Sequence, residues 1–159
     1  SGEVLQHQGV PVPGEKPAGV AWLETVVPGE LAVLDAQAFG ADRTPLFAAL
    51  VARARFAEVR QEGVLKGFAA LRSFGRGEVI GPIVAENAET AKALIAFVIA
   101  ERPGMFLRVD TTADTGLAPW LVENGLAHVG GGIAMRRPKT DIAPGRKFKT
   151  FALTSQALG

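Results

Sequence analysis

Several residue types that would define a protein class are scarce or missing from this chain of 159 residues. It contains no cysteine, which excludes disulfide bonds, thiolate nucleophiles and cysteine metal sites. Its two histidines, His7 and His128, are far apart in sequence, so we predict no metal site. Basic and acidic residues number 17 and 16, and the net charge of +1 gives no overall field that would attract nucleic acid or a membrane.

Long hydrophobic segments are also missing. The longest wholly apolar run, Ala93 to Ala100, is too short to cross a bilayer, and no signal-peptide pattern opens the chain, which predicts a soluble cytoplasmic protein. Hydrophobic residues make up 48% of the sequence and favour one compact domain with a substantial core. Ser1 and Gly2 stand in place of an initial methionine, and we interpret them as a cleavage scar or the cut edge of a longer protein.

The segment from Glu78 to Glu101 predicts a buried strand, a tight turn and a long helix. Its first part is rich in β-branched residues, as in a strand covered on both faces. Gly81 and Pro82 interrupt this strand, and because proline cannot donate to a β ladder, we expect a bulge or a separation from one neighbour there. Asn87 is the expected N-cap of the helix. A helix N-terminus that points at such a defect suits an anion, although an ordinary β-α unit explains the same residues.

The rest of the chain predicts a mixed sheet with helices. Residues 1–19 contain three prolines and no hydrophobic periodicity, and we interpret them as a linker, strap or tag-derived leader before one domain, 20–159. We expect a strand, two helices, a hairpin, the central strand and helix, then a strand, a helix and two strands. Their ranges are 20–27, 31–39, 45–54, 57–59, 64–71, 78–85, 88–101, 105–109, 117–122, 127–135 and 147–154. Strands outnumber helices, and only the middle of the chain alternates strand with helix. We therefore expect an α/β protein whose sheet is mixed, as in the α+β class.

Short motifs accompany this order of elements. They are Leu34-Asp35, Phe39-Gly40, Asp42-Arg43, Ile80-Gly81-Pro82, Val84-Ala85, Leu107-Arg108-Val109-Asp110, Asn124-Gly125-Leu126 and Met135-Arg136. Together they resemble, over residues 20–159, the GNAT superfamily of acyl-CoA-dependent N-acetyltransferases, and in particular the C-terminal domain of bacterial tandem-GNAT proteins. The resemblance implies a mostly antiparallel mixed sheet with a bulged central strand and helices on both faces. It also implies a second GNAT domain in the full-length chain as a partner.

The resemblance implies a place for acetyl-CoA as cosubstrate. In that superfamily the pantetheine lies in the gap beside the bulged strand, and amides of a loop with the pattern R/Q-x-x-G-x-G/A bind the pyrophosphate. The residues at those positions are Ile83, Val84, Asn87, Ala88, Glu89, Thr90 and Ala91. Of the loop pattern only Ala91 agrees, because Glu86 and Glu89 replace the arginine or glutamine and the first glycine. Two carboxylates there predict weakened binding, although acidic residues in a first turn also complement the helix dipole.

The superfamily's chemistry deprotonates an amine and commonly uses a tyrosine to protonate the leaving thiolate. This chain contains no tyrosine, and Leu121 stands at the matching position. The candidate bases are Glu78 on the central strand and Asp110 at the end of the next, although carboxylates in solvent or in ion pairs are commoner at such places. His128 is a third candidate, with a structural role as its alternative. The expected acceptor is a small-molecule amine or a peptide N-terminus.

Basic residues suggest two further roles. Arg43, at a helix entrance, is interpreted as a structural ion-pair or capping residue. Six basic residues lie between 136 and 149 and could hold the 3′-phosphate of CoA or an acidic partner, although a solvated loop is the more common explanation of such a run.

Two functions are consistent with the sequence. The first is an acetyl-CoA-dependent N-acetyltransferase domain that acts on an unknown amine. The second is a catalytically degenerate partner or regulatory domain of a tandem acetyltransferase, which the altered loop and the missing tyrosine favour.

Overall fold

The computed structural model describes residues 4–75, 77–129 and 147–153. Its strands are β1 (Val4–Gly9), β2 (Val20–Trp22), β3 (Ala54–Gln61), β4 (Val64–Phe74), β5 (Gly77–Ala85), β6 (Leu107–Thr112), β7 (Ala127–His128) and β8 (Lys149–Ala152). Its helices are α1 (Pro28–Phe39), α2 (Thr44–Val51), α3 (Ala88–Glu101) and α4 (Ala118–Glu123), with a short 3₁₀ turn at Ala113–Thr115. From β2 onward this is the order of elements that the sequence predicts.

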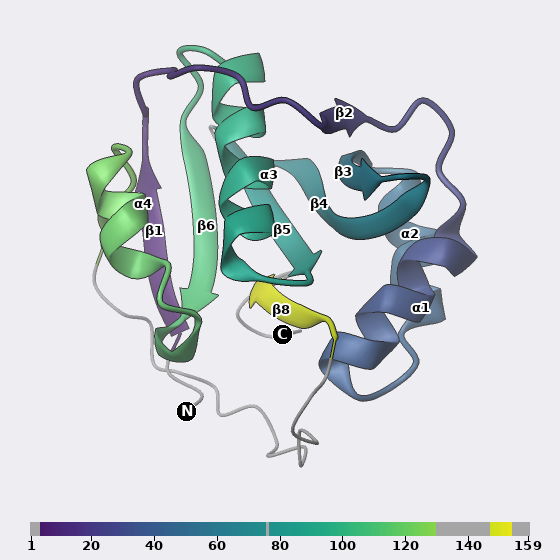
Figure 1. Ribbon diagram of the computed structural model, residues 1–159. Coiled ribbons are helices and arrows are strands. Elements are labelled where there is room, and N and C mark those ends of the chain that lie inside the picture. The colour runs from purple at the N-terminus through teal and green to yellow at the C-terminus, as the bar shows by residue number, and fades with distance from the viewer. Residues whose placement is uncertain (1–3, 76, 130–146, 154–159) are drawn as a thin grey trace.

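The described strands form one mixed sheet (Figure 1). Its order is β2-β3-β4-β5-β6-β1-β7, and β8 pairs with β5 outside this path. The pairing of β5 with β6 is parallel, and the other pairings are antiparallel. The expectation of a mixed, mostly antiparallel sheet is therefore confirmed.

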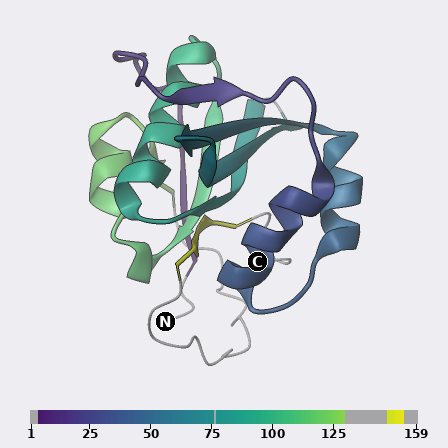
Figure 2. The same cartoon turned by 45° about the vertical axis from the view of Figure 1, so that its right-hand side comes forward.

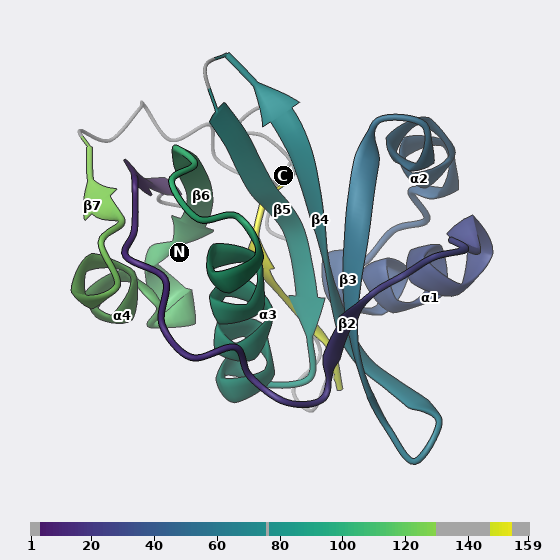
Figure 3. The same cartoon turned by 90° about the horizontal axis from the view of Figure 1, so that it is seen from above.

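Helices cover both faces of this sheet, as Figure 3 shows from above. On one face, α1 and α2 pack on a cluster that contains Phe47, Phe56 and Phe68. On the other face, α3 and α4 contribute to a cluster that contains Leu94 and Leu121. Burial of large apolar side chains on both faces explains why β4 and β5 read as nearly continuous hydrophobic runs rather than alternating ones.

The central strand carries the predicted defect. The register between β4 and β5 shifts between Ala69 and Leu71, opposite the Gly81-Pro82 peptide, which is cis. Ile80 and Ile83 consequently pack in the same core cluster, although residues three apart in a regular strand point to opposite faces. The predicted bulge is therefore present, and it changes the face to which the second half of β5 points.

The helix that follows is also as predicted. The side chain of Asn87 caps it by accepting a hydrogen bond from the Thr90 amide at 2.8 Å. Gly104, two residues beyond the Arg102 C-cap, has a φ of 78°, a conformation that glycine adopts without strain. The two-residue turn Glu62-Gly63 has positive φ at both residues and joins β3 to β4 as the predicted hairpin.

The N-terminal segment differs from the expectation. Residues 4–9, interpreted above as part of a linker, form β1, which lies between β6 and β7 in the sheet. The residues after it cross the C-terminal end of α3 (Figure 2), where Glu101 accepts hydrogen bonds from Lys16 at 3.0 Å and from Trp22 at 2.9 Å. Strand β1 therefore belongs to the sheet itself, and residues 10–19 connect it to β2.

Strand β6 is longer than predicted. Asp110, Thr111 and Thr112 continue the strand instead of ending it or forming a loop. Of the strand expected over 127–135, β7 contains Ala127 and His128, and residues 130–146, which include the Met135-Arg136 motif, lie outside the described residues. Within the described part of the chain, no helix combines the length and the hydrophobicity needed to cross a membrane.

Candidate functional site

The parallel strands β5 and β6 pair only at their beginnings. Glu78 pairs with Leu107 and Val79 with Arg108, and beyond these two pairs the strands separate. Strand β5 runs on through the Gly81-Pro82 defect to Ala85, and α3 begins three residues later. The structure thus contains a gap between two parallel strands that opens toward the N-terminus of a helix, as the sequence predicts.

Strand β8 occupies this gap. It pairs antiparallel with β5, with Ala152 opposite Ile83, Thr150 opposite Val84 and Lys149 opposite Ala85. On its other side it bonds to β6, because the Leu153 amide donates to the carbonyl oxygen of Asp110 at 2.7 Å. Figure 1 shows β8 beside the carboxyl ends of β5 and β6. The sheet is therefore continuous across the place where the two parallel strands part.

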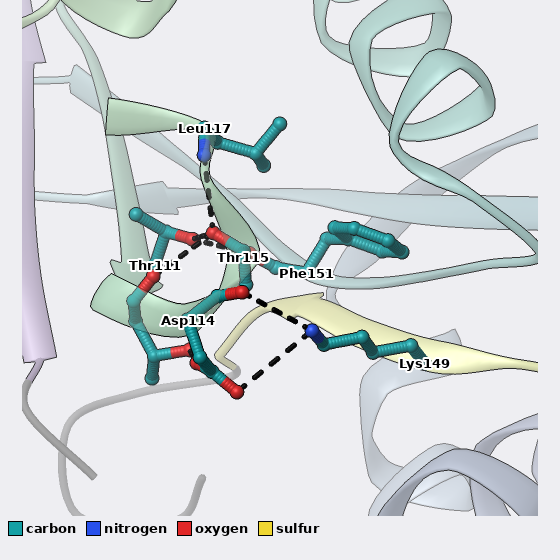
Figure 4. A network of polar contacts seen from close by, with 7 residues as sticks. Thr111, Asp114, Thr115, Leu117, Lys149 and Phe151 are labelled. Atoms are coloured by element: carbon teal, nitrogen blue, oxygen red, sulfur yellow. Dashed lines mark hydrogen bonds and ion pairs between the residues drawn. The ribbon is translucent and has the colours of Figure 1, made fainter. Parts of the chain in front are cut away.

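A polar network at the end of β6 holds β8 in place (Figure 4). The Thr111 hydroxyl donates to the Phe151 carbonyl oxygen at 2.7 Å and lies 2.7 Å from the Thr115 hydroxyl. The Lys149 ammonium donates to the Asp114 carbonyl oxygen at 3.3 Å and lies 3.8 Å from its carboxylate. We call these five residues the β8 clasp.

The two candidate bases lie on opposite faces of the sheet. Glu78 accepts a hydrogen bond from Arg102, at the end of α3, at 2.7 Å. Leu107 and Val109 of β6 pack in the core on the α3 face, so Asp110, the next residue of an alternating strand, points to the other face. Asp110 is 1% exposed and accepts a hydrogen bond from Arg108 at 3.0 Å. The structure therefore does not bring the two carboxylates into one site.

The predicted pantetheine residues are inside the sheet. Ile83 and Val84 are fully buried, and their backbones pair with β4 on one side and β8 on the other. Ile83 packs in the cluster under α3, and Val84 packs in the cluster under α1 and α2. Both residues line the gap with their backbone rather than with their side chains.

The first turn of α3 holds the remaining predicted cofactor residues. Asn87 and Thr90 make the capping hydrogen bond described above, and the Ala91 amide donates to the Asn87 carbonyl oxygen at 3.2 Å. Ala91 is fully buried in the core, and Ala88 packs against the same cluster. Ala91 is small because α3 packs closely on the sheet there, which is a structural reason independent of any ligand.

The two acidic residues near this turn are differently placed. Glu89 projects into solvent, with 86% of its side chain exposed, and lies 3.6 Å from Lys92. Glu86 lies beside Lys66 of β4 at 3.2 Å and is partly buried. Both carboxylates therefore have a lysine partner, but the Glu89 pair is longer and more exposed to solvent, so its charge is less firmly balanced than that of Glu86.

The remaining positions that the sequence singled out are Leu121 and His128. Leu121, at the position of the superfamily tyrosine, is fully buried in the core. His128 is exposed, and its ring centroid lies 5.3 Å from that of His7. His7 is buried, with Nδ1 2.9 Å from the Leu126 carbonyl oxygen, and burial lowers the pKa of its imidazole. In the described ranges, no three histidine, aspartate or glutamate residues come close enough together to hold a metal ion.

Sequence reasoning missed the residues that fill the gap. The strand of β8 was expected, but nothing in its sequence indicates which strand it pairs with. The available signal is a pair of aromatic residues, Phe148 and Phe151, which flank the polar residues Lys149 and Thr150. Both aromatic side chains are buried, at most 5% exposed. Pairing across about 65 residues is a tertiary property that no local pattern encodes.

Solved structures share this fold. A candidate acetyltransferase from Pyrococcus horikoshii is 19% identical with a TM-score of 0.64, over 99% of this chain and 52% of that one. A candidate GNAT-family acetyltransferase from Novosphingobium aromaticivorans is 19% identical with a TM-score of 0.55, over 82% of this chain and 61% of its own. A GCN5-related N-acetyltransferase from Sphaerobacter thermophilus is 20% identical with a TM-score of 0.53, over 81% and 49%. The chain spans roughly half to three fifths of each of these proteins.

Sequence comparison gives the family. No curated protein matches the chain significantly in sequence. A family description of the acetyltransferase (GNAT) domain matches residues 31–151, from the first turn of α1 into β8, which includes the gap, the first turn of α3 and the β8 clasp. The chain therefore belongs to the GNAT family of acetyltransferases.

Proposed function

We propose that this GNAT domain is an acetyl-CoA-dependent N-acetyltransferase domain that transfers the acetyl group to a small-molecule amine or a peptide N-terminus. The observation that carries the proposal is the separation of β5 from β6 directly before the N-terminus of α3. The edge of β5 that β6 leaves, with which β8 pairs in this structure, has backbone groups that suit an extended amide chain such as pantetheine, and a helix N-terminus attracts a pyrophosphate. The strand edge and the helix N-terminus follow one another within residues 78–91.

This arrangement assigns a direction to the cofactor. With the pyrophosphate at Asn87 to Ala91 and the pantetheine along Ile83 and Val84, the thioester points toward the Gly81-Pro82 defect. Glu78 lies beyond that defect on the same strand, whereas the Asp110 side chain faces away from α3. Glu78 is therefore the better placed of the two candidate bases, and the amine would approach from its side.

The missing tyrosine changes the expected mechanism. Leu121 offers no proton to the leaving thiolate, so the thiolate of CoA must take its proton from solvent or from the attacking amine. Direct attack of the amine forms the new C–N bond and breaks the C–S bond of the thioester. Glu78 receives the proton that the nitrogen loses, CoA leaves as a thiolate that takes a proton from solvent, and Glu78 returns its own proton to solvent.

The test is a calorimetric titration with acetyl-CoA at low salt, followed by release of CoA thiol with a panel of amines and peptides. Glu89→Gln should bind acetyl-CoA more tightly, because it removes a negative charge at the proposed pyrophosphate site that a solvent-exposed pair with Lys92 screens only weakly. Glu62→Gln, in the exposed β3-β4 turn, is the matched control and should not change the affinity. Binding that responds equally to both substitutions, or no binding to any variant, would refute the proposal.

A second function is favoured by a specific observation, the filling of the gap by β8. Phe148, Phe151 and Leu153 are buried on this strand, and burial of such side chains stabilises a fold by about 1.5 to 3 kcal/mol each. Their sum is comparable to the roughly 8 kcal/mol with which a micromolar ligand binds. If acetyl-CoA cannot displace the strand, the domain is a degenerate partner or regulatory domain. Folded protein that binds no acetyl-CoA in the same titration would support this second function.

A further inference from the structure

We infer that β8 and acetyl-CoA are alternative occupants of one slot, so that the domain holds its own cofactor site closed with its C-terminal strand. The inference rests on the proposed acetyl-CoA site along β5. It adds a regulatory step to that site, because binding of the cofactor then requires release of β8. It concerns residues that the proposed reaction itself does not use, namely Lys149 to Leu153 and the other members of the β8 clasp, Thr111, Asp114 and Thr115.

The first argument is the use of backbone groups. The segment from Ile83 to Ala85 has two edges, and β4 takes one of them through Ala69, Phe68 and Gly67. Strand β8 takes the other through Ala152, Thr150 and Lys149. An edge amide or carbonyl group in a strand makes its ladder bond to one neighbour, so a pantetheine chain and β8 cannot both pair with this edge.

The second argument is that β8 joins β5 to β6. Its Leu153 amide and Phe151 carbonyl oxygen bond to Asp110 and Thr111 of β6, while its other edge pairs with β5. Such a bridge spans the full width of the gap. An occupant of the gap must therefore displace the strand rather than lie beside it.

The third argument concerns how firmly β8 is held. Phe148 packs in the cluster under α1 and α2, and Phe151 packs in the cluster under α3, so the strand is anchored on both faces of the sheet. Against this, β8 makes three pairs with β5, and the register shifts between the first two. The Thr150 hydroxyl is buried and has no hydrogen-bond partner among the residues that the structure describes. The docking is thus strong in apolar contact and imperfect in polar contact, which is what a strand that can be released requires.

Two isosteric substitutions should shift the closed state in opposite directions. Thr111→Val removes the hydroxyl that bonds to the Phe151 carbonyl oxygen, so it should loosen β8 and tighten acetyl-CoA binding by roughly fivefold. Thr150→Val removes the unpartnered buried hydroxyl, so it should hold β8 more firmly and weaken acetyl-CoA binding by roughly the same factor. Thr111→Ser keeps the donor and should bind acetyl-CoA like the unaltered chain.

The experiment combines two measurements on the full 159-residue chain and on these three variants. Calorimetry with acetyl-CoA gives the affinity. Amide hydrogen exchange at Leu153, whose N–H donates to Asp110, reports whether β8 is docked. We expect affinity to rise as the protection of Leu153 falls across the series, and saturating acetyl-CoA to remove that protection from the unaltered chain.

Two outcomes overturn the inference, and they are distinguishable. If acetyl-CoA binds while Leu153 keeps its protection, and the two valine variants bind alike, the cofactor site is elsewhere than the β8 slot and the proposed acetyl-CoA activity survives. If Thr111→Val loses the protection of Leu153 in a folded protein and acetyl-CoA still does not bind, the slot is not a cofactor site and the proposed activity falls with the inference.

Discussion

The ion pair of Asp35 and Arg43 anchors the connection between α1 and α2. Asp35 is fully buried on α1, and its two carboxylate oxygens accept hydrogen bonds from Arg43 at 2.6 and 2.8 Å. The Arg43 side chain is 10% exposed, and its guanidinium lies 3.7 Å from the centroid of the Phe39 ring. The arginine that the sequence suggested as a structural ion-pair residue is thus bidentate, stacked and nearly buried.

The burial of this ion pair determines how much stability is lost when one partner is replaced. Replacement of one partner of a buried pair leaves the other charge uncompensated, which costs about 3 to 5 kcal/mol. We therefore expect Asp35→Ala and Arg43→Ala each to lose that much from a total stability of about 5 to 15 kcal/mol for a domain. Removal of both charges with apolar residues of similar volume is often neutral, so Asp35→Leu with Arg43→Met should recover most of the loss.

Urea unfolding followed by circular dichroism measures these differences. The matched control is Lys92→Ala, because its partner Glu89 is exposed and such a pair contributes only about 0 to 1 kcal/mol. The reasoning would be refuted if either single substitution at the buried pair cost no more than the control. It would equally fail if the double variant lost the sum of the two single losses.

Three further predictions concern single residues. Burial lowers the pKa of His7, so as the pH falls the unfolded chain takes up a proton before the folded chain does. The free energy of unfolding should therefore fall below about pH 6.5, by up to about 1.4 kcal/mol per pH unit. His7→Gln should flatten this slope in urea unfolding measured across pH. A Cβ at Gly77 would lie 2.1 Å from the Phe106 carbonyl oxygen, so Gly77→Ala should lower the melting temperature by several degrees in calorimetry, whereas Gly14→Ala, with open space around it, should not. Asn87→Ala should cost about 0.5 to 2 kcal/mol in urea unfolding by removing the α3 N-cap, and Asn87→Asp should retain most of that stability.

Much of the fold follows from local patterns in the sequence. Asn87 before an apolar helical repeat and Gly40 after another mark helix ends, because each satisfies a specific backbone requirement at its position. Glu62-Gly63 fixes the β3-β4 hairpin for the same reason. Gly81-Pro82 predicts the bulge, since proline removes a donor from the ladder. These signals act over a few residues, so one sequence is sufficient to read them.

The parts that were not predicted depend on pairing over long distances. Strand β1 buries Val4 and His7, whereas Leu5, Gln6 and Gln8 are partly exposed, and it is held in the sheet by backbone pairing with β6. Its sequence therefore carries little of the signal that identifies a strand. The opposite faces of Glu78 and Asp110 depend on the register of two strands, and a shift of one residue would reverse either assignment.

The position of β8 connects the defect in β5 to the function of the domain. Gly81-Pro82 allows β5 to leave β6, and the edge that this exposes is complementary to any extended chain with amide groups. Pantetheine is one such chain and a β-strand is another, which is why we propose that the same slot accepts either. Which one occupies it depends on a comparison of two free energies, the burial of the aromatic residues of β8 and the binding of acetyl-CoA with its pyrophosphate. Substitution of Gly81 or of the pyrophosphate loop alters the second, and substitution of Phe151 or Thr111 alters the first. On this proposal, the domain would change from enzyme to partner through β8 while its central strand and helix stay the same.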